Sequence, residues 1–359
     1  MRWFKKQKRP QKPRGVLLIS SGGLGDTILL SLVFEQFMKL ALPSETVTLV
    51  LPSESVKMSF LFDSKIIVFP IDYKVFQKSR SYVKTLTERL YSEHYRIVIS
   101  TDFLRHPKRD EVIVKFCDAP QVYAMEPRSW PKYNKDLQKN RGLYNSLYNS
   151  GPDHVDKVLR WTGFANWLTG EATSPPKVRL SKRWVAPVGA HLNPMVFLVP
   201  FSAVKEKQSP PEVFLAIIKH LKSDYDLIIA CASNDMDENQ EYLKIADVNN
   251  IMIDNSTFED LVPKLKQAAL VVSVDTATMH LAVGLGTPTV CIASAAYVNE
   301  IIPYAPEITP NNVRFVYQSM ACEGCLGNCC LPLQEGRFPC VMRIEIPRIL
   351  TTIDELLIR

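Results

Sequence analysis

The sequence lacks any stretch near the roughly 18–20 consecutive apolar residues that a membrane-spanning helix requires. The N-terminus also lacks the apolar segment of an export signal, and no short-period repeat runs through the chain. These absences predict a cytoplasmic protein. Hydrophobic residues make up 46 % and charged residues 22 %, which excludes disorder and coiled coil over most of the chain. The length of 359 residues is that of two domains.

Acidic residues are absent from a basic tail, residues 1–14, which carries seven Lys and Arg side chains together with Trp3 and Phe4. The net charge is +6, so the rest of the chain is close to neutral, at −1. The positive charge therefore gives no evidence for nucleic-acid binding. The tail either contacts an anionic membrane surface, at about 1 kcal/mol per basic residue near the headgroups, or is a solvated extension.

Apolar strands alternate with segments of helical spacing through most of the sequence, which predicts an α/β protein with parallel sheets covered on both faces. Residues 118–173 interrupt this alternation. We expect an N-terminal domain at 15–185, a Pro-marked linker at 186–194 and a C-terminal domain at 195–359. The predicted strands are 15–20, 46–51, 65–69, 96–100, 195–200, 226–231, 250–254, 270–275 and 288–293, and the predicted helices include 27–42, 79–91, 153–167, 211–221 and 258–268.

A glycine-rich turn, SGGLGD at 21–26, follows the first predicted strand, where ligands bind in open α/β sheets. Gly22, Gly23 and Gly25 allow backbone to approach a ligand closely. The spacing fits neither a dinucleotide fingerprint nor a P-loop. Asp26 then lies at the start of a helix whose dipole keeps it ionised; it is either a functional carboxylate or a helix cap.

Two further segments follow strands of the second half. In PFSAVKEKQSP at 200–210, Ser202 can donate to an anion and Lys207 can supply a cation, although a solvated polar loop has the same composition. In SVDTATMHL at 273–281, a strand ends in Asp-Thr and turns into a helix, which directs backbone N–H groups at a phosphate. His280 in that helix is either a ligand-binding residue or an interior histidine.

Five cysteines gather in a Cys-rich loop, residues 320–342. Without an export signal, this clustering favours a metal over disulfides. A closed tetrahedral zinc site made of four thiolates would be structural, and free thiols are the alternative interpretation. The five are Cys322, Cys325, Cys329, Cys330 and Cys340.

The combination of GGLGD, KQSP and SVDTATMHLAVGLGTPTV resembles glycosyltransferase family 9, the ADP-heptose:lipopolysaccharide heptosyltransferases, over about residues 15–345. The segment at 154–159 (HVDKVL) also resembles the helix that precedes the interdomain linker of that family. The resemblance implies a GT-B fold of two facing Rossmann-like domains. It places the nucleotide-sugar donor in the C-terminal domain and the acceptor in the N-terminal domain.

The resemblance also assigns roles to single residues. Asp26 matches the catalytic aspartate, and Lys207 matches the lysine of a Lys-x-Trp-Pro motif. Donor-binding positions correspond to Asp275, Thr276 and His280. Ser202, which can donate to an anion, is expected to contact the diphosphate beside them. Two departures concern the donor: Ala277 replaces a glycine beside the diphosphate, and Ser209 replaces the tryptophan.

The implied reaction is inverting sugar transfer, with Asp26 as general base and no metal needed for catalysis. Residues 118–173 are expected to carry acceptor specificity, with Arg105, Lys108 and Arg109 as anion contacts. Iron becomes the alternative to zinc in the Cys-rich loop, because a protein-glycosylating branch of the family resembles this arrangement and holds iron.

Three functions remain open at this point. The first is transfer of heptose from ADP-heptose to a lipopolysaccharide core or a related lipid-linked glycan, with the basic tail at the inner membrane face. The second is an autotransporter-type protein heptosyltransferase. The third is a catalytically silent relative that binds a nucleotide-sugar.

Overall fold

A computed structural model describes residue 9, residues 12–180 and residues 193–357. The chain divides into two compact units. Unit 1 comprises residues 1–153 and 158–174, and unit 2 comprises residues 154–157 and 175–359. The basic tail, apart from residues 9 and 12–14, and most of the predicted linker at 186–194 lie outside the described residues.

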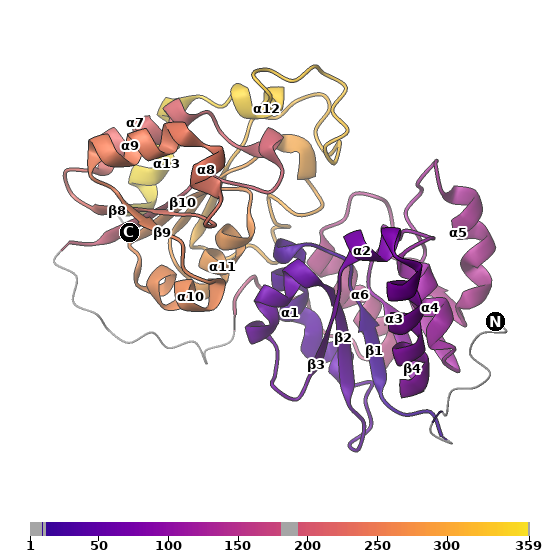
Figure 1. Ribbon diagram of the computed structural model, residues 1–359. Coiled ribbons are helices and arrows are strands. Elements are labelled where there is room, and N and C mark those ends of the chain that lie inside the picture. The colour runs from indigo at the N-terminus through magenta and orange to yellow at the C-terminus, as the bar shows by residue number, and fades with distance from the viewer. Residues whose placement is uncertain (1–8, 10–11, 181–192, 358–359) are drawn as a thin grey trace. The chain divides into compact units, whose positions relative to one another are not determined.

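The described part of unit 1 contains a six-stranded parallel sheet (Figure 1) in the order β3-β2-β1-β4-β5-β6. All four residues of β1 are buried, as expected for a strand that helices cover on both faces. The strands are β1 (Val16–Ile19), β2 (Val47–Pro52), β3 (Ile67–Ile71), β4 (Ile97–Ser100), β5 (Gln121–Met125) and β6 (Ser146–Tyr148). The helices are α1 (Leu24–Met38), α2 (Tyr73–Lys78), α3 (Arg80–Glu93), α4 (Asp110–Cys117), α5 (Asn134–Asn140) and α6 (Lys157–Thr169).

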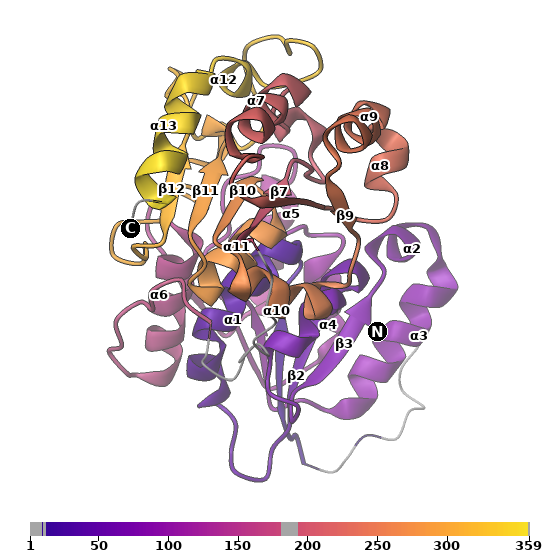
Figure 2. The same cartoon turned by 90° about the vertical axis from the view of Figure 1, so that its left-hand side faces the viewer.

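Unit 2 has, in its described residues, a second six-stranded parallel sheet in the order β12-β11-β10-β7-β8-β9, seen with its central strands side by side in Figure 2. Its core includes the buried face of α7, whose apolar residues recur at helical spacing. The strands are β7 (Met195–Val199), β8 (Asp226–Ala230), β9 (Met252–Asp254), β10 (Leu270–Val274), β11 (Thr289–Ile292) and β12 (Val313–Val316). The helices are α7 (Pro211–Leu221), α8 (Asp235–Glu238), α9 (Gln240–Asn249), α10 (Phe258–Gln267), α11 (Ala277–Leu285), α12 (Pro339–Met342) and α13 (Ile346–Leu357).

The two sheets have the same strand order once each is numbered from its own first strand, namely 3-2-1-4-5-6. In this Rossmann order the chain direction across the sheet reverses between the first and the fourth strand, and ligands bind at that switch point, beyond the carboxyl ends of the strands. The switch point lies between β1 and β4 in unit 1 and between β7 and β10 in unit 2.

The segment 118–173 is more regular than its sequence suggests. It contributes β5 and β6, which extend the first sheet and were not predicted, because both are short and neither is apolar throughout. The helix predicted at 153–167 begins at Lys157 instead. Residues 154–157 belong to unit 2 and are hydrogen-bonded within it: Ala305 N–H donates to Asp156 and Lys157 N–H donates to the carbonyl of Glu300.

Residues 175–180 also pack with unit 2, ahead of the predicted boundary at 185. Backbone hydrogen bonds join Val178 N–H to the carbonyl of Ile308 and Leu180 N–H to that of Gly284. Across the described ranges, no helix combines the length and the apolar character needed to cross a bilayer.

Candidate functional site

The glycine-rich turn joins β1 to α1 at the switch point of unit 1. α1 begins at Leu24, so Asp26 stands in its first turn, where its Oδ2 accepts a hydrogen bond from Gly23 N–H at 3.0 Å. The carboxylate therefore caps the helix, as one of the two interpretations of this residue predicts. The carboxylate is half-buried.

Gly22 has a steric reason to be glycine. A Cβ at this position would lie 2.5 Å from the Cβ of Asp26 and 2.8 Å from its Oδ2. Its carbonyl also accepts a hydrogen bond from Ser55 at 3.1 Å. Gly25 lies within the first turn of α1, and a Cβ on Gly23 would meet nothing within 4 Å. Close approach is thus required at Gly22.

Asp102 is a polar residue of this switch point that sequence reasoning missed. It follows β4, and its Oδ2 accepts two hydrogen bonds from Ser21, at 2.7 Å from the backbone N–H and 2.9 Å from the hydroxyl. The carboxylate thereby ties the loop after β4 to the loop after β1. Its place directly after a predicted strand was the signal that could have identified it.

Lys207 and Asp275, 68 residues apart in the sequence, meet at the switch point of unit 2. Lys207 lies in a short 3₁₀ helix (Lys205–Lys207) beyond β7, and Asp275 directly follows β10. The Lys207 Nζ donates to Asp275 Oδ2 at 2.6 Å. Their side chains are only 11 % and 8 % exposed, so the pair is largely shielded from water and from salt.

The N-terminus of α11 lies beside this pair. Thr276 is the N-cap in extended conformation, and its side chain makes no capping hydrogen bond. Ala277 is the first helical residue and is buried. A helix N-terminus favours anions because its first N–H groups lack intrahelical acceptors and the dipole is positive there. The ammonium of Lys207 and the N-terminus of α11 therefore both favour an anion at the switch point of unit 2.

His280 is buried in α11, one turn beyond the N-terminus. Its Nδ1 lies 2.6 Å from the hydroxyl of Tyr304, which sequence reasoning did not identify. Burial is the largest of the causes that raise the pKa of Tyr304 well above its ordinary value. The phenol therefore keeps its proton, and a proton donated to Nδ1 would leave the Nε2–H tautomer of the imidazole.

The loop between β7 and α7 has polar residues beside Lys207. Ser202 is half-buried; its carbonyl accepts from Gln208 Nε2 at 2.9 Å, which fixes the path of the loop. Ser209 is 2 % exposed, and its hydroxyl has no hydrogen-bond partner. The small side chain thus lies in the interior at the position where the sequence departs from the Lys-x-Trp-Pro motif that it resembles.

The Cys-rich loop brings several thiols together. The pKa of Cys322 is raised to about 11 by desolvation, by a hydrogen bond with Cys329 and by the nearby charges of Cys330 and Cys325. Cys340 is buried, and its Sγ accepts from Ala295 N–H at 3.3 Å. All five are free cysteines. Among the residues that the structure describes, no three His, Cys, Asp or Glu side chains are arranged as metal ligands.

The basic residues expected to bind acceptor anions are engaged inside unit 1. Arg105 is 1 % exposed, donates to the carbonyl of Met125 at 2.6 Å and pairs with Glu111, so it cannot meet a ligand. Arg109 pairs with Asp110 at 2.8 Å. Lys108 is exposed and lies 3.9 Å from an acidic residue of α5. The expectation was wrong for Arg105 because its contacts with Met125 of β5 and Glu111 of α4 were not anticipated.

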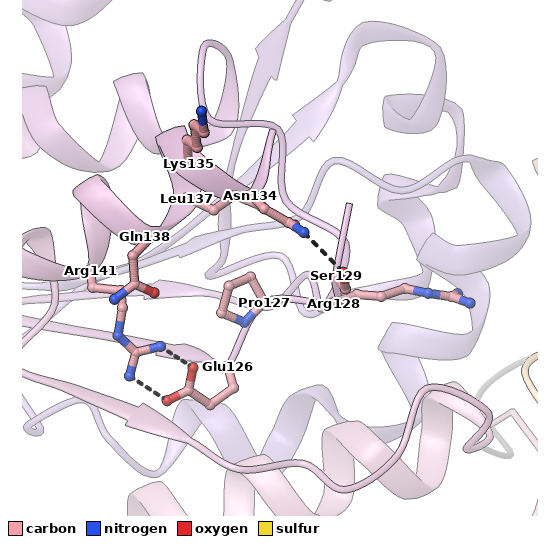
Figure 3. A pocket seen from close by; sticks show the side chains of 9 residues that line it. All are labelled: Glu126, Pro127, Arg128, Ser129, Asn134, Lys135, Leu137, Gln138 and Arg141. Atoms are coloured by element: carbon pink, nitrogen blue, oxygen red, sulfur yellow. Dashed lines mark hydrogen bonds and ion pairs between the residues drawn. The ribbon is translucent and has the colours of Figure 1, made fainter. Parts of the chain in front are cut away.

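A pocket of about 620 Å³ lies beyond β5 instead (Figure 3). Its floor includes the paired side chains of Glu126 and Arg141, and Asn134 donates to the hydroxyl of Ser129 at 3.1 Å. Carboxylate, guanidinium and amide groups around a hollow suit a polyhydroxy compound. The lining residues are Glu126, Pro127, Arg128, Ser129, Asn134, Lys135, Leu137, Gln138 and Arg141.

Comparison with known proteins identifies a family that matches part of the chain. Residues 156–325 match the model of glycosyltransferase family 9 (heptosyltransferase). The resemblance to this family is confirmed. The matched segment contains Lys207, Asp275, Thr276 and His280, whereas Asp26 lies outside it. No curated protein matches the chain in sequence.

Solved structures of family-9 and related glycosyltransferases share the fold. Escherichia coli ADP-heptose lipopolysaccharide heptosyltransferase II matches with a TM-score of 0.67 at 14 % identity, over 96 % of this chain and 98 % of its own. E. coli heptosyltransferase WaaC with ADP-2-deoxy-2-fluoro heptose matches with 0.67 at 16 % identity, over 95 % and 99 %. The chain therefore has the expected GT-B-type fold with two parallel sheets.

A third match is the iron-containing dodecameric glycosyltransferase TibC from enterotoxigenic E. coli, with a TM-score of 0.56 at 16 % identity. It covers 96 % of this chain and 76 % of the TibC chain. The likeness again concerns the fold. The roles of the individual site residues stay predictions.

Proposed function

We propose that the protein is an inverting glycosyltransferase that moves a heptose from ADP-heptose to a hydroxyl of a lipopolysaccharide core or a related cell-surface glycan. The observation that carries this proposal is the shielded pair of Lys207 and Asp275 beside the uncapped N-terminus of α11. Such a site suits a diphosphate, because its charge is met by an ammonium and by a helix N-terminus.

Unit 2 holds the leaving group in this proposal. As the sugar departs, negative charge grows on the nucleoside diphosphate, and Lys207, Thr276 and Ser202 stabilise it where it develops. Asp275 orients the lysine before the donor binds and then accepts a hydroxyl of the donor. His280, with its tautomer set by Tyr304, donates from Nε2 to the nucleotide.

Unit 1 supplies the acceptor side. An alcohol is too weak an acid for an ordinary carboxylate to ionise it outright. Asp26 therefore accepts the proton late, when attack on the anomeric carbon is well advanced. General-base assistance of this kind contributes about 10²–10⁴-fold. The hydrogen bond from Gly23 orients the carboxylate for this role. The basic tail contacts the membrane surface that carries the lipid-linked acceptor.

A panel of nucleotides tests the donor site. ADP, UDP, GDP and CDP are added separately to the full chain, and the rise in melting temperature is measured, because a ligand that binds the folded state stabilises it. We expect ADP and ADP-heptose to give the largest rise. Lys207→Met abolishes most of the rise, whereas Lys205→Met, in the same loop but 65 % exposed and paired with Glu238, leaves it unchanged.

Two outcomes of this panel oppose the proposal. If no nucleoside diphosphate raises the melting temperature, the proposed site in unit 2 does not bind a nucleotide donor. If ADP-heptose binds but no sugar is released in the presence of lipid-linked glycans or peptides, the chain is the silent binding relative and not a transferase.

A second candidate function is transfer to a protein acceptor. The clustered thiols of the Cys-rich loop favour it, and one fold match is to an iron-containing glycosyltransferase. Cys322, Cys325, Cys340 and one of Cys329 and Cys330 would hold zinc or iron in a closed, structural site. The metal would supply rigidity to the loop rather than take part in transfer. Transfer of the sugar from ADP-heptose to a peptide acceptor in the absence of lipid would favour this candidate.

A further inference from the structure

Lys207 is held by two side chains. Besides Asp275 Oδ2 at 2.6 Å, its Nζ lies 4.7 Å from the centre of the Tyr297 ring. An ammonium within about 6 Å of an aromatic face is attracted by the electrons of the ring, and more strongly when both groups are shielded from water. The side chain of Lys207 is only 11 % exposed. The ring therefore contributes to the position of the ammonium.

Tyr297 comes from a 3₁₀ turn, Ala295–Tyr297, that the Cys-rich loop holds in place. Gly324 N–H donates to the carbonyl of Ala295 at 2.8 Å, and Leu326 N–H donates to that of Ala296 at 2.7 Å. Two consecutive carbonyls of the turn are thus bound by the loop. The turn cannot shift without breaking these hydrogen bonds.

The same loop also binds the segment that carries the lysine. Phe338 N–H donates to the carbonyl of Glu206 at 2.9 Å, next to Lys207 in the sequence. Phe338 and Tyr297 pack in one apolar cluster with cysteines of the loop. A Cβ on Gly327 would lie 3.6 Å from the Tyr297 hydroxyl. The Cys-rich loop therefore fixes both partners of the ring–ammonium contact.

We propose that Tyr297 is a positioning residue for Lys207, and that the Cys-rich loop acts on the donor site through it. A free lysine side chain has large rotamer entropy, which binding of a diphosphate would have to overcome. The ring and Asp275 remove that freedom in advance. When the diphosphate competes with Asp275 for the ammonium, the ring keeps Nζ in place. This inference rests on the proposed donor site.

Calorimetry with ADP and with adenosine tests the proposal on the full chain. Tyr297→Leu removes the ring, and we expect ADP affinity to fall by about three- to tenfold while adenosine affinity stays the same. Tyr297→Phe keeps the ring and restores ADP affinity. Tyr317→Leu is the matched control, because Tyr317 packs in the same cluster without contacting Lys207.

A fluorinated series separates positioning from packing. Phenylalanines with increasing numbers of fluorine atoms at position 297 retain the ring shape and withdraw its electrons. ADP affinity should fall stepwise along the series. Adenosine affinity, which does not depend on the ammonium, should stay constant along the series. If Tyr297→Leu does not fold, the fluorinated analogues still test whether Tyr297 positions Lys207.

The outcomes distinguish this proposal from the proposed function. If the unchanged protein binds no nucleoside diphosphate, the donor site itself is wrong. If the unchanged protein binds ADP but affinity is equal across the fluorinated series, Tyr297 has only a packing role and the proposal is overturned.

Discussion

Gly22 and Asp26 are packed against each other so closely that a Cβ on Gly22 would lie 2.8 Å from the carboxylate Oδ2. The same oxygen accepts the hydrogen bond from Gly23 N–H. The loop thus fixes the orientation of the carboxylate from two sides. Helix capping and general-base catalysis are therefore two roles that one Asp26 side chain can serve together.

Substitution of Asp26 can separate these two roles. Asp26→Asn keeps an oxygen that accepts from Gly23 but cannot take a proton from an alcohol. We expect sugar transfer to fall by about 10²–10⁴-fold, with an unchanged melting temperature and unchanged ADP affinity. Asp26→Ala should lose the same activity and, in addition, about 0.5–1.5 kcal/mol of unfolding free energy, because the N-cap N–H of Gly23 loses its acceptor. Transfer that survives in Asp26→Asn would refute the base assignment.

Gly22→Ala should disturb the carboxylate without touching its chemistry. The added methyl overlaps Asp26, so the loop or the carboxylate must move, and a displacement of about 1 Å can cost on the order of 10²-fold in rate. We expect turnover to fall at least tenfold while ADP affinity is kept. Gly23→Ala is the control, because a Cβ there meets nothing within 4 Å. Equal effects of the two substitutions would contradict this account.

The fold was largely predictable from the sequence because its strands are short apolar runs between turn residues. The helix predicted at 211–221 is α7 with the same bounds. β5 and β6 were missed because both are short and lack a continuous apolar pattern: β5 begins with the exposed Gln121, and the edge strand β6 has no buried residue. The start of α6 was misplaced because Asp156 binds the backbone of Ala305, a contact that helical spacing cannot reveal.

Within the candidate site, only residues that follow predicted strands could be predicted from the sequence. Asp26, Lys207 and Asp275 stand after β1, β7 and β10, so the carboxyl-end rule places them. Tyr297 ends a short 3₁₀ turn and Tyr304 lies outside the helices and strands, and only tertiary packing brings them to Lys207 and His280. Aromatic residues in loops have no spacing from which such contacts can be predicted.

The ion pair of Glu45 and Arg96 should give unit 1 a pH-dependent stability. The hydrogen bond from Arg96 is the largest cause that lowers the pKa of Glu45, from its ordinary value of 4.5 to about 2. A lowered pKa in the folded state means that the contribution is present above pH 4.5 and is lost as the pH falls toward 2. Glu45→Gln should therefore cost about 1–3 kcal/mol at pH 7 and almost nothing at pH 2.

Thermal unfolding of both proteins from pH 7 to pH 2 measures this difference. Glu54→Gln provides the control, since its pair with Lys57 is exposed and surface pairs contribute little. A Glu45→Gln deficit that stays constant down to pH 2 would show that packing, and not the charge, explains the loss.

A chelator should reveal whether the Cys-rich loop holds a metal. Four thiolates around zinc or iron would stabilise the fold, because the metal binds only the folded arrangement. We expect elemental analysis of the purified protein to give one metal per chain, and chelation to lower the melting temperature before it lowers ADP affinity. Cys325→Ser should reproduce both effects, whereas Cys231→Ser, far from the loop in sequence and beside β8, should not.

The order of the two effects follows from the contacts of the loop. Its backbone still holds the turn of Tyr297 through Gly324 and Leu326 when the thiols are merely loosened, so Lys207 stays in place until the loop unfolds. Affinity for the donor should therefore be lost only at temperatures at which the Cys-rich loop has unfolded. A chelator that changes neither melting temperature nor affinity would mean that the cysteines are not a structural metal site. Loss of affinity without any loss of stability would mean that the metal acts directly on the donor.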